Sequence, residues 1–155
     1  MRRTRPLPAP VAAFDARLRA FLRDPEARAL AGYNWTEGGC GILALALAAW
    51  LGSETALVGV FGYEDETETD VLHHVVLALG PWYLDGRGAS RRAELLETWF
   101  IEEDLVSPSL APVTAAALRR AHINTVAETV RAVTRLLDRH LGPGAEARRI
   151  LGATV

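Results

Sequence analysis

The sequence predicts a single α+β domain, and three observations carry this prediction. Segment 40–51 is apolar on every side, so as a helix it must be buried all round. Three β-rich segments follow it, and a glycine–proline pair joins the last two, which is typical of an antiparallel hairpin. Amphipathic helical patterns stand on both sides of this central region. We therefore expect a buried helix and a small antiparallel sheet, surrounded by helices.

Composition limits the kinds of partner. The chain has 155 residues, of which 50% are apolar and 23% charged, as expected for one globular domain with a real core. A formal net charge of −2 gives no general attraction to nucleic acid or to anionic lipid. No apolar run approaches the roughly 20 residues that span a bilayer. We expect neither a nucleic-acid partner nor a membrane.

The N-terminal region and the cysteine content indicate the compartment. Residues 1–10 contain three prolines and three arginines and are expected to form a flexible lead-in to a domain at 11–155. No apolar signal segment follows the basic start, which favours a cytoplasmic protein. The single cysteine excludes an internal disulfide and a cysteine-rich zinc site, and fits a reducing compartment. No cofactor or metal is predicted, and the oligomeric state stays open.

The N-terminal third is expected to be helical. Residues 11–23 carry apolar side chains at helical spacing. Asp24 can cap a second, short helix with Pro25 at its first position. Residues 32–39 read as a loop that leads into the buried helix, and Gly52 closes that helix.

Strands are expected at 55–61, 71–79 and 82–85, with an acidic, solvated hairpin loop between the first two. Gly80 and Pro81 form a two-residue turn in this interpretation, so Leu79 pairs with Trp82.

The last third is expected to be mostly helical. Ser90 is predicted to cap a helix that runs to about residue 99, residues 106–112 to form a loop, and residues 113–120 another helix. Thr125 and Glu128 match a capping box that opens a helix to about residue 140. The apolar stripe of that helix is predicted to comprise Val126, Val130, Val133 and Leu137. Residues 142–144, Gly-Pro-Gly, end it.

The position of Cys40 is the strongest chemical signal. Gly38 and Gly39 precede it, so the thiol falls in the first turn of the buried helix, where a close approach by a substrate is possible. The partial positive charge and free N–H groups of a helix N-terminus favour a thiolate and lower the thiol pKa. The same groups can stabilise an oxyanion. The alternative is that Cys40 is a small buried apolar side chain.

A thiol nucleophile needs a base, and the base needs a group that orients it. The two-residue turn sets Val76 opposite Asp85, and His74 shares a face with Val76, so its imidazole falls diagonally next to the Asp85 carboxylate. His73 points to the opposite face. If the turn were one residue longer, His73 and not His74 would lie next to the Asp85 carboxylate.

The order of these elements resembles the papain-like cysteine hydrolase superfamily, particularly its small bacterial and phage members. The likeness covers residues 33–88: a helix-start cysteine, then a strand histidine, then an acid one strand later. It implies a papain-like fold in which Cys40, His74 and Asp85 form a catalytic triad. It also implies that the backbone N–H of Cys40 and the amide of Asn34, where papain-type enzymes carry a glutamine, donate to the oxyanion. Gly39 and His73 are expected to border the cleft, and Trp35 to be either a packing residue or a wall of the cleft.

The implied activity is that of a cysteine-dependent hydrolase or acyltransferase acting on an amide or peptide bond through a thioester. The protease signature around the nucleophile has another cysteine and an aromatic flank, whereas this chain has Gly38 and Gly39 before Cys40 and Gly41 after it. The histidine also follows the cysteine more closely than in the large enzymes. Protease, amidase, deamidase and transferase activities therefore all stay open. The alternative is a papain-like binding or scaffold protein without chemistry, including a phage- or toxin-associated effector.

Overall fold

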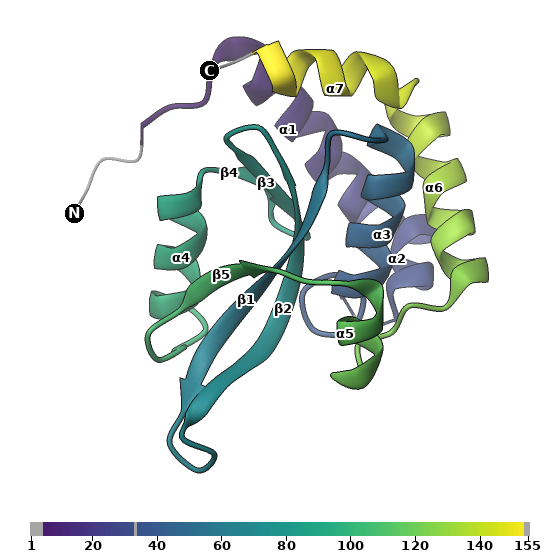
Figure 1. Cartoon of the computed structure of the whole chain (residues 1–155). Coiled ribbons are helices and arrows are strands. Elements are labelled where there is room, and N and C mark those ends of the chain that lie inside the picture. Colours follow the sequence, from purple (N-terminus) through teal and green to yellow (C-terminus); the bar gives the residue numbers. More distant parts are fainter. Residues whose placement is uncertain (1–4, 33, 154–155) are drawn as a thin grey trace.

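A computed structural model describes residues 5–32 and 34–153, which form seven helices and one antiparallel sheet of five strands in the order β4-β3-β2-β1-β5. Most of the helices lie together on one side of the sheet, and α4 lies on the other side (Figure 1). The α+β class is confirmed. Residues 1–4 of the expected lead-in lie outside the described residues, and α1 begins within the remainder, at Ala9.

The first three helices follow the expectation closely. Helix α1 spans Ala9–Arg23 and α2 spans Pro25–Ala31, where the Asp24 side chain accepts a hydrogen bond from the N–H of Ala27 at 3.2 Å. Helix α3 spans Cys40–Leu51, and nine of its residues are buried. An all-apolar helix is stable in water only when other elements cover it on every side. Its main neighbours are α6 and β2, so it lies at the centre of the molecule.

The central hairpins position the candidate site. Strand β1 (Ala56–Glu64) pairs with β2 (Thr69–Leu79), and a register irregularity interrupts the pairing after Val60. Strand β3 (Trp82–Asp85) pairs with β2 through a turn in which Leu79 is opposite Trp82, as the two-residue turn requires. Gly80 has a φ of +57°, which a glycine adopts without strain.

Two short strands and one helix start differ from the sequence prediction. Strand β4 (Gly88–Ser90) occupies the segment expected to begin a helix at Ser90, and α4 (Arg92–Ile101) begins after Arg91 instead. Strand β5 (Ser109–Pro112), which pairs with β1, replaces part of the loop expected at 106–112. Both strands are too short for a period-two pattern to stand out, and their partners in the sheet determine them.

The C-terminal helices differ from the sequence prediction in two respects, the cap of α6 and the presence of a further helix. Helix α5 spans Ala115–Arg120 with Thr114 as its N-cap, and α6 spans Ala127–Leu141. The capping box at Thr125 is wrong, because Val126 is the N-cap and the Asn124 side chain accepts the Val126 N–H at 3.1 Å. Helix α7 (Gly144–Ala153) was missed: Gly144, expected to end α6, opens another helix against Trp50 of α3.

In the described part of the chain, three apolar clusters hold the layers together. The largest joins the helical layer to one face of the sheet, including Leu47 of α3 and Leu77 of β2. A second, around Val76 and Trp99, fills the space between the other face and α4. The third surrounds Cys40 and Val75. On β2 the side chains alternate between the two faces, so the histidine at position 74 is directed with Val76 toward α4.

A buried carboxylate joins the helical layer to the edge of the sheet. Asp15 of α1 is 7% exposed and accepts hydrogen bonds from the N–H of Ala89 at 2.7 Å and from Arg19 Nε at 2.9 Å. Among the helices of the described ranges, none is both long and apolar enough to cross a membrane.

Candidate functional site

The site begins at the N-terminal end of α3, where Gly39 is the N-cap and Cys40 the first helical residue. The helical hydrogen bonds start with the N–H of Leu43, which donates to the carbonyl of Gly39 at 2.9 Å. The N–H groups of Cys40, Gly41 and Ile42 therefore precede the first helical bond and have no carbonyl within the helix to bind. This end of the helix favours negative charge.

Close packing fixes the start of α3 against the segment between α5 and α6. A Cβ atom added at Gly41 would lie 2.5 Å from Cγ2 of Ile123 and 2.6 Å from the carbonyl oxygen of Asn124. Only glycine permits this approach. Gly41, one of the glycines by which this chain departs from the protease signature, thus has a structural reason here.

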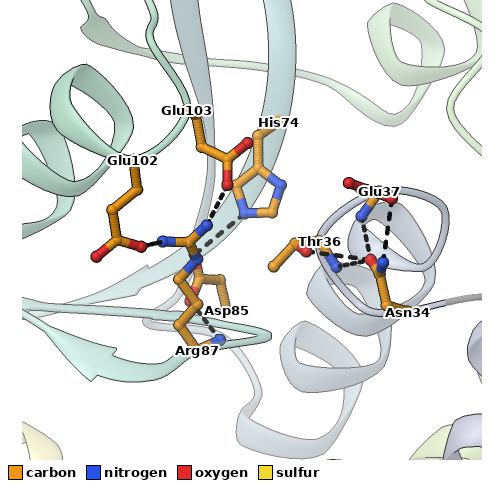
Figure 2. Close-up of polar contacts among 8 residues, drawn as sticks. All are labelled: Asn34, Thr36, Glu37, His74, Asp85, Arg87, Glu102 and Glu103. Carbon is orange, nitrogen blue, oxygen red and sulfur yellow. Dashed lines mark hydrogen bonds and ion pairs between the residues drawn. The ribbon is translucent and has the colours of Figure 1, made fainter.

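His74 and Asp85 meet across the β2–β3 hairpin. Nε2 of His74 lies 3.1 Å from Oδ2 of Asp85, and the backbone N–H of Arg87 donates to the other carboxylate oxygen at 2.9 Å (Figure 2). Both side chains are buried, with His74 at 0% and Asp85 at 4% exposure. The register from the two-residue turn thus brings together the histidine and the acid that the sequence singled out.

The other ring nitrogen of His74 is available for the thiol. Nδ1 is buried and has no hydrogen bond of ordinary geometry within the described part of the chain. Trp99 covers the imidazole, with ring centroids 4.6 Å apart. In the view of Figure 2, Nδ1 points away from Asp85 and toward the loop that leads into α3. Because Nε2 is held by Asp85, the Cys40 thiol can interact with the ring only through Nδ1.

The ionisation of the two groups is coupled. Burial opposes both charges, but the hydrogen bond and charge of Asp85, together with the interaction with Cys40, raise the pKa of His74 to about 9. Burial also disfavours a thiolate, yet the contact with His74 and the N–H groups of Val75 and Gly41 lower the pKa of Cys40 below its ordinary value. Both shifts favour a thiolate–imidazolium pair.

Arg87 fastens the turn that carries Asp85 to the end of α4. Its guanidinium pairs with Glu102 at 2.5 Å and with Glu103 (Figure 2). It also lies 6.0 Å from the ring centroid of Trp99. The same residue therefore holds Asp85 through its backbone and the C-terminal end of α4 through its side chain.

A cavity of about 790 Å³, called here the Cys40 cleft, opens beside the thiol. Its wall comes from four parts of the chain: the loop before α3, the β1–β2 hairpin, the segment after α4, and the segment after α5. This volume is in the range of small-molecule and peptide side-chain sites. Cys40 is 6% exposed and borders this space, so the thiol is buried but not enclosed by apolar atoms alone.

The residues expected around the cleft divide into two groups. His73 lines it, with Nε2 lying 3.0 Å from Glu64 Oε1. Trp35 belongs to the core, where its indole N–H donates to the carbonyl of Leu22 at 3.0 Å, and Gly39 packs against Ala31. Neither Trp35 nor Gly39 is among the described residues that line the cleft.

The Asn34 side chain holds the loop before α3. Its Oδ1 accepts from the N–H of Glu37 at 2.6 Å and from the N–H and hydroxyl of Thr36 (Figure 2). Its Nδ2 donates to Glu37 Oε2 at 3.2 Å. In this arrangement the amide shapes the turn that delivers Cys40 to the start of α3, and Asn34 does not line the cleft.

Sequence reasoning missed several residues of the site. Trp99, which the sequence did not single out as a site residue, covers His74 and lines the cleft. His122, which has a φ of +59°, and Asp104 also line it. Both Asp104 and His122 lie far from Cys40 in the sequence and follow helix ends, where no spacing rule applies. The single signal that could have drawn attention to Trp99 was an aromatic residue on a helix close after Asp85.

No protein-family model matches the chain, and comparisons with curated proteins and with solved structures found no match either.

Proposed function

We propose that this protein is a cysteine-dependent hydrolase or acyltransferase with a papain-like arrangement, acting on an amide or peptide bond through a thioester. The observation that carries the proposal is the buried His74, which is bound to Asp85 through Nε2 and keeps Nδ1 for the thiol of Cys40. An unpartnered buried ring nitrogen costs stability, so its presence favours a functional role for this nitrogen.

Three further features support this proposal. The nucleophile lies at a helix N-terminus, which stabilises a thiolate. The pKa values of the thiol and the imidazole are displaced in opposite directions, as an activated nucleophile and its base require. The thiol borders a cleft large enough for part of a peptide. Within the described residues, no hydrogen bond of ordinary geometry joins the thiol to Nδ1 of His74, which is common before a substrate is bound.

The proposed reaction has two steps. The Cys40 thiolate attacks the carbonyl carbon, forming a carbon–sulfur bond, while the oxygen becomes an oxyanion near the free N–H groups at the start of α3. The imidazolium of His74 gives its proton to the departing nitrogen as the carbon–nitrogen bond breaks. Water or an amine then attacks the thioester, His74 takes its proton, and the thiolate leaves. Asp85 keeps the imidazole oriented throughout.

Asn34 enters this proposal in a limited role. Oxyanion stabilisation by its amide needs the Nδ2 group to turn from Glu37 toward the thiol, whereas the backbone N–H of Cys40 already points out of the helix end. We therefore assign the oxyanion first to the backbone, and to Asn34 only the shaping of the loop unless substrate moves it.

Alkylation of the single cysteine tests the proposal. Intact-mass measurement during treatment with iodoacetamide at pH 6 should show Cys40 reacting about tenfold faster than free cysteine, because a larger fraction is thiolate. His74→Gln should abolish the excess rate. His140→Gln, at the far end of α6, is the matched control and should retain it.

Acyl transfer is tested with p-nitrophenyl acetate. The protein should form an acetyl adduct on Cys40 and then lose it, with turnover absent in Cys40→Ser and reduced in Asp85→Asn. Labelling at the rate of free cysteine, or equal rates with and without His74, would contradict the proposal and favour a binding protein that uses the same cleft.

A further inference from the structure

We infer that the Cys40 cleft selects a positively charged substrate, so that an amide or peptide bond next to a guanidinium or ammonium group is the bond presented to the thiol. This inference rests on the proposed function and names its substrate class. The cleft volume, the Cys40 thiol on its wall and the charge of its walls together carry it.

The charged side chains that line the cleft are predominantly acidic. Four carboxylates come from three separate segments of the chain: Glu37, Glu64, Glu103 and Asp104. Among the described lining residues there is no arginine, although the chain has 17 basic residues. Of the lining residues that the structure describes, only His73 and His122 could add positive charge there. The acids belong to the wall around the candidate nucleophile and are not an isolated surface cluster.

Two of these carboxylates already have cationic or ionisable partners. Glu103 pairs with Arg87, and Glu64 lies 3.0 Å from His73. Glu37 accepts a hydrogen bond from the neutral amide of Asn34, and no ion pair within the described chain involves Asp104. Glu37 and Asp104 therefore leave uncompensated negative charge on the cleft. In the view of Figure 2, Glu37 and Glu103, the neighbour of Asp104, lie on opposite sides of His74.

Apolar side chains accompany these acids. Leu72, Leu105 and Ile123 line the cleft together with the ring of Trp99. Trp99 is 5% exposed, and its indole N–H has no hydrogen-bond partner within the described residues. An aliphatic stem that ends in a cation fits this combination, since the stem contacts the apolar wall and the charge reaches the carboxylates at the rim. Clefts of one charge sign concentrate ligands of the opposite sign.

Charged thiol reagents test this inference without a known substrate. A methanethiosulfonate transfers its thioalkyl group to a thiolate, forming a mixed disulfide and releasing methanesulfinate. Three reagents are compared: cationic trimethylammonioethyl, neutral methyl and anionic sulfonatoethyl methanethiosulfonate. Relative to the same ratio for free cysteine, Cys40 should react about tenfold faster with the cationic than with the anionic reagent, and added salt should reduce the preference.

Variants of the cleft identify the source of the preference. Asp104→Asn should lower the cation preference severalfold, and asparagine suits the left-handed φ of +54° at this position. Glu37→Gln should act in the same direction. Glu54→Gln, an exposed acid beyond the opposite end of α3, is the matched control and should leave the preference unchanged.

The outcomes separate the two proposals. No cation preference, or a preference that Asp104→Asn and Glu37→Gln leave intact, overturns the assignment of substrate charge even when the neutral reagent reveals an activated thiol. A slow reaction of Cys40 with the neutral reagent contradicts the proposed chemistry, and the ratio between the charged reagents still reports the selectivity of the cleft.

Discussion

The contact with Asp85 strengthens proton binding by His74. The histidine has no exposed surface, and Asp85 with Cys40 raises its pKa to about 9. In NMR spectra recorded against pH, one histidine ring signal should titrate near pH 9, and it should be the signal lost in His74→Gln. Asp85→Asn should move that titration to lower pH, because the largest favourable contribution to the charged form is removed. Equal titration in both proteins would show that Asp85 does not stabilise the imidazolium.

The same shift has a consequence for stability. Because folding raises the pKa of His74 from 6.5 to about 9, this group's contribution is complete below pH 6.5 and is lost as the pH rises through about 9. The lowered pKa of Cys40 acts in the opposite direction: its contribution is present above 9.0 and is lost as the pH falls through the folded value. As the pH rises from 6.5 to about 9, the free energy of unfolding loses the contribution of His74 and gains that of Cys40, so the two changes partly cancel.

At the residue scale, the choice between the two histidines could be made from the sequence, because strand alternation and a two-residue turn leave one solution. The hydrogen-bond partners of the Asn34 side chain could not be predicted in this way. Its Oδ1 is satisfied by N–H groups two and three residues later, a local bond that competes with any more distant role. The match of Asn34 in residue type and spacing to the glutamine of papain-type enzymes does not indicate whether its side chain binds the local N–H groups or the oxyanion.

Among the elements, the start of α3 is the most constrained. Gly41→Ala should destabilise the protein by about 1–3 kcal/mol, because the added methyl group overlaps Ile123 and the backbone of Asn124. It should also displace the thiol and slow its alkylation at pH 6. Urea unfolding measures the first effect and intact mass the second.

A second glycine gives the control for this experiment. Among the described residues, no atom lies within 4 Å of a Cβ atom added at Gly152 of α7, so Gly152→Ala should be neutral or stabilising by up to about 1 kcal/mol. If both variants were equally stable, the close approach at Gly41 would not be needed for the fold.

Elements with strong internal patterns were predictable, and those defined by neighbours were not. The bounds of α3 follow from an uninterrupted apolar run between glycines, and both confirmed strands of the β2–β3 hairpin flank a turn pair. Strands β4 and β5 are short and depend on β3 and β1 for their hydrogen bonds. The Thr125 motif failed because Asn124 offered the chain a different turn.

At the scale of the whole molecule, α3 connects the candidate chemistry to the stability of the fold. Its N-terminal end carries Cys40, its middle lies in the largest apolar cluster, and its C-terminal end meets α7, where Arg148 donates to the carbonyl of Leu51 at 2.8 Å. The site therefore depends on packing in both layers, since Asp85 lies on the sheet and Trp99 on the helix across it.

This dependence predicts cooperative unfolding. Trp35, Trp50 and Trp82 report on the largest cluster and Trp99 on the cluster beneath α4, so tryptophan fluorescence samples both layers. Its urea midpoint should coincide with that of the far-ultraviolet circular dichroism. Leu47→Ala, at a site with 0% exposure, should lower both midpoints together through a loss of about 2–5 kcal/mol. Val126→Ala, at an exposed helix start, should change stability by less than about 0.5 kcal/mol. Separate transitions for the two probes would mean that the layer carrying α4 unfolds independently of α3, and that the cleft between them can open without loss of the core.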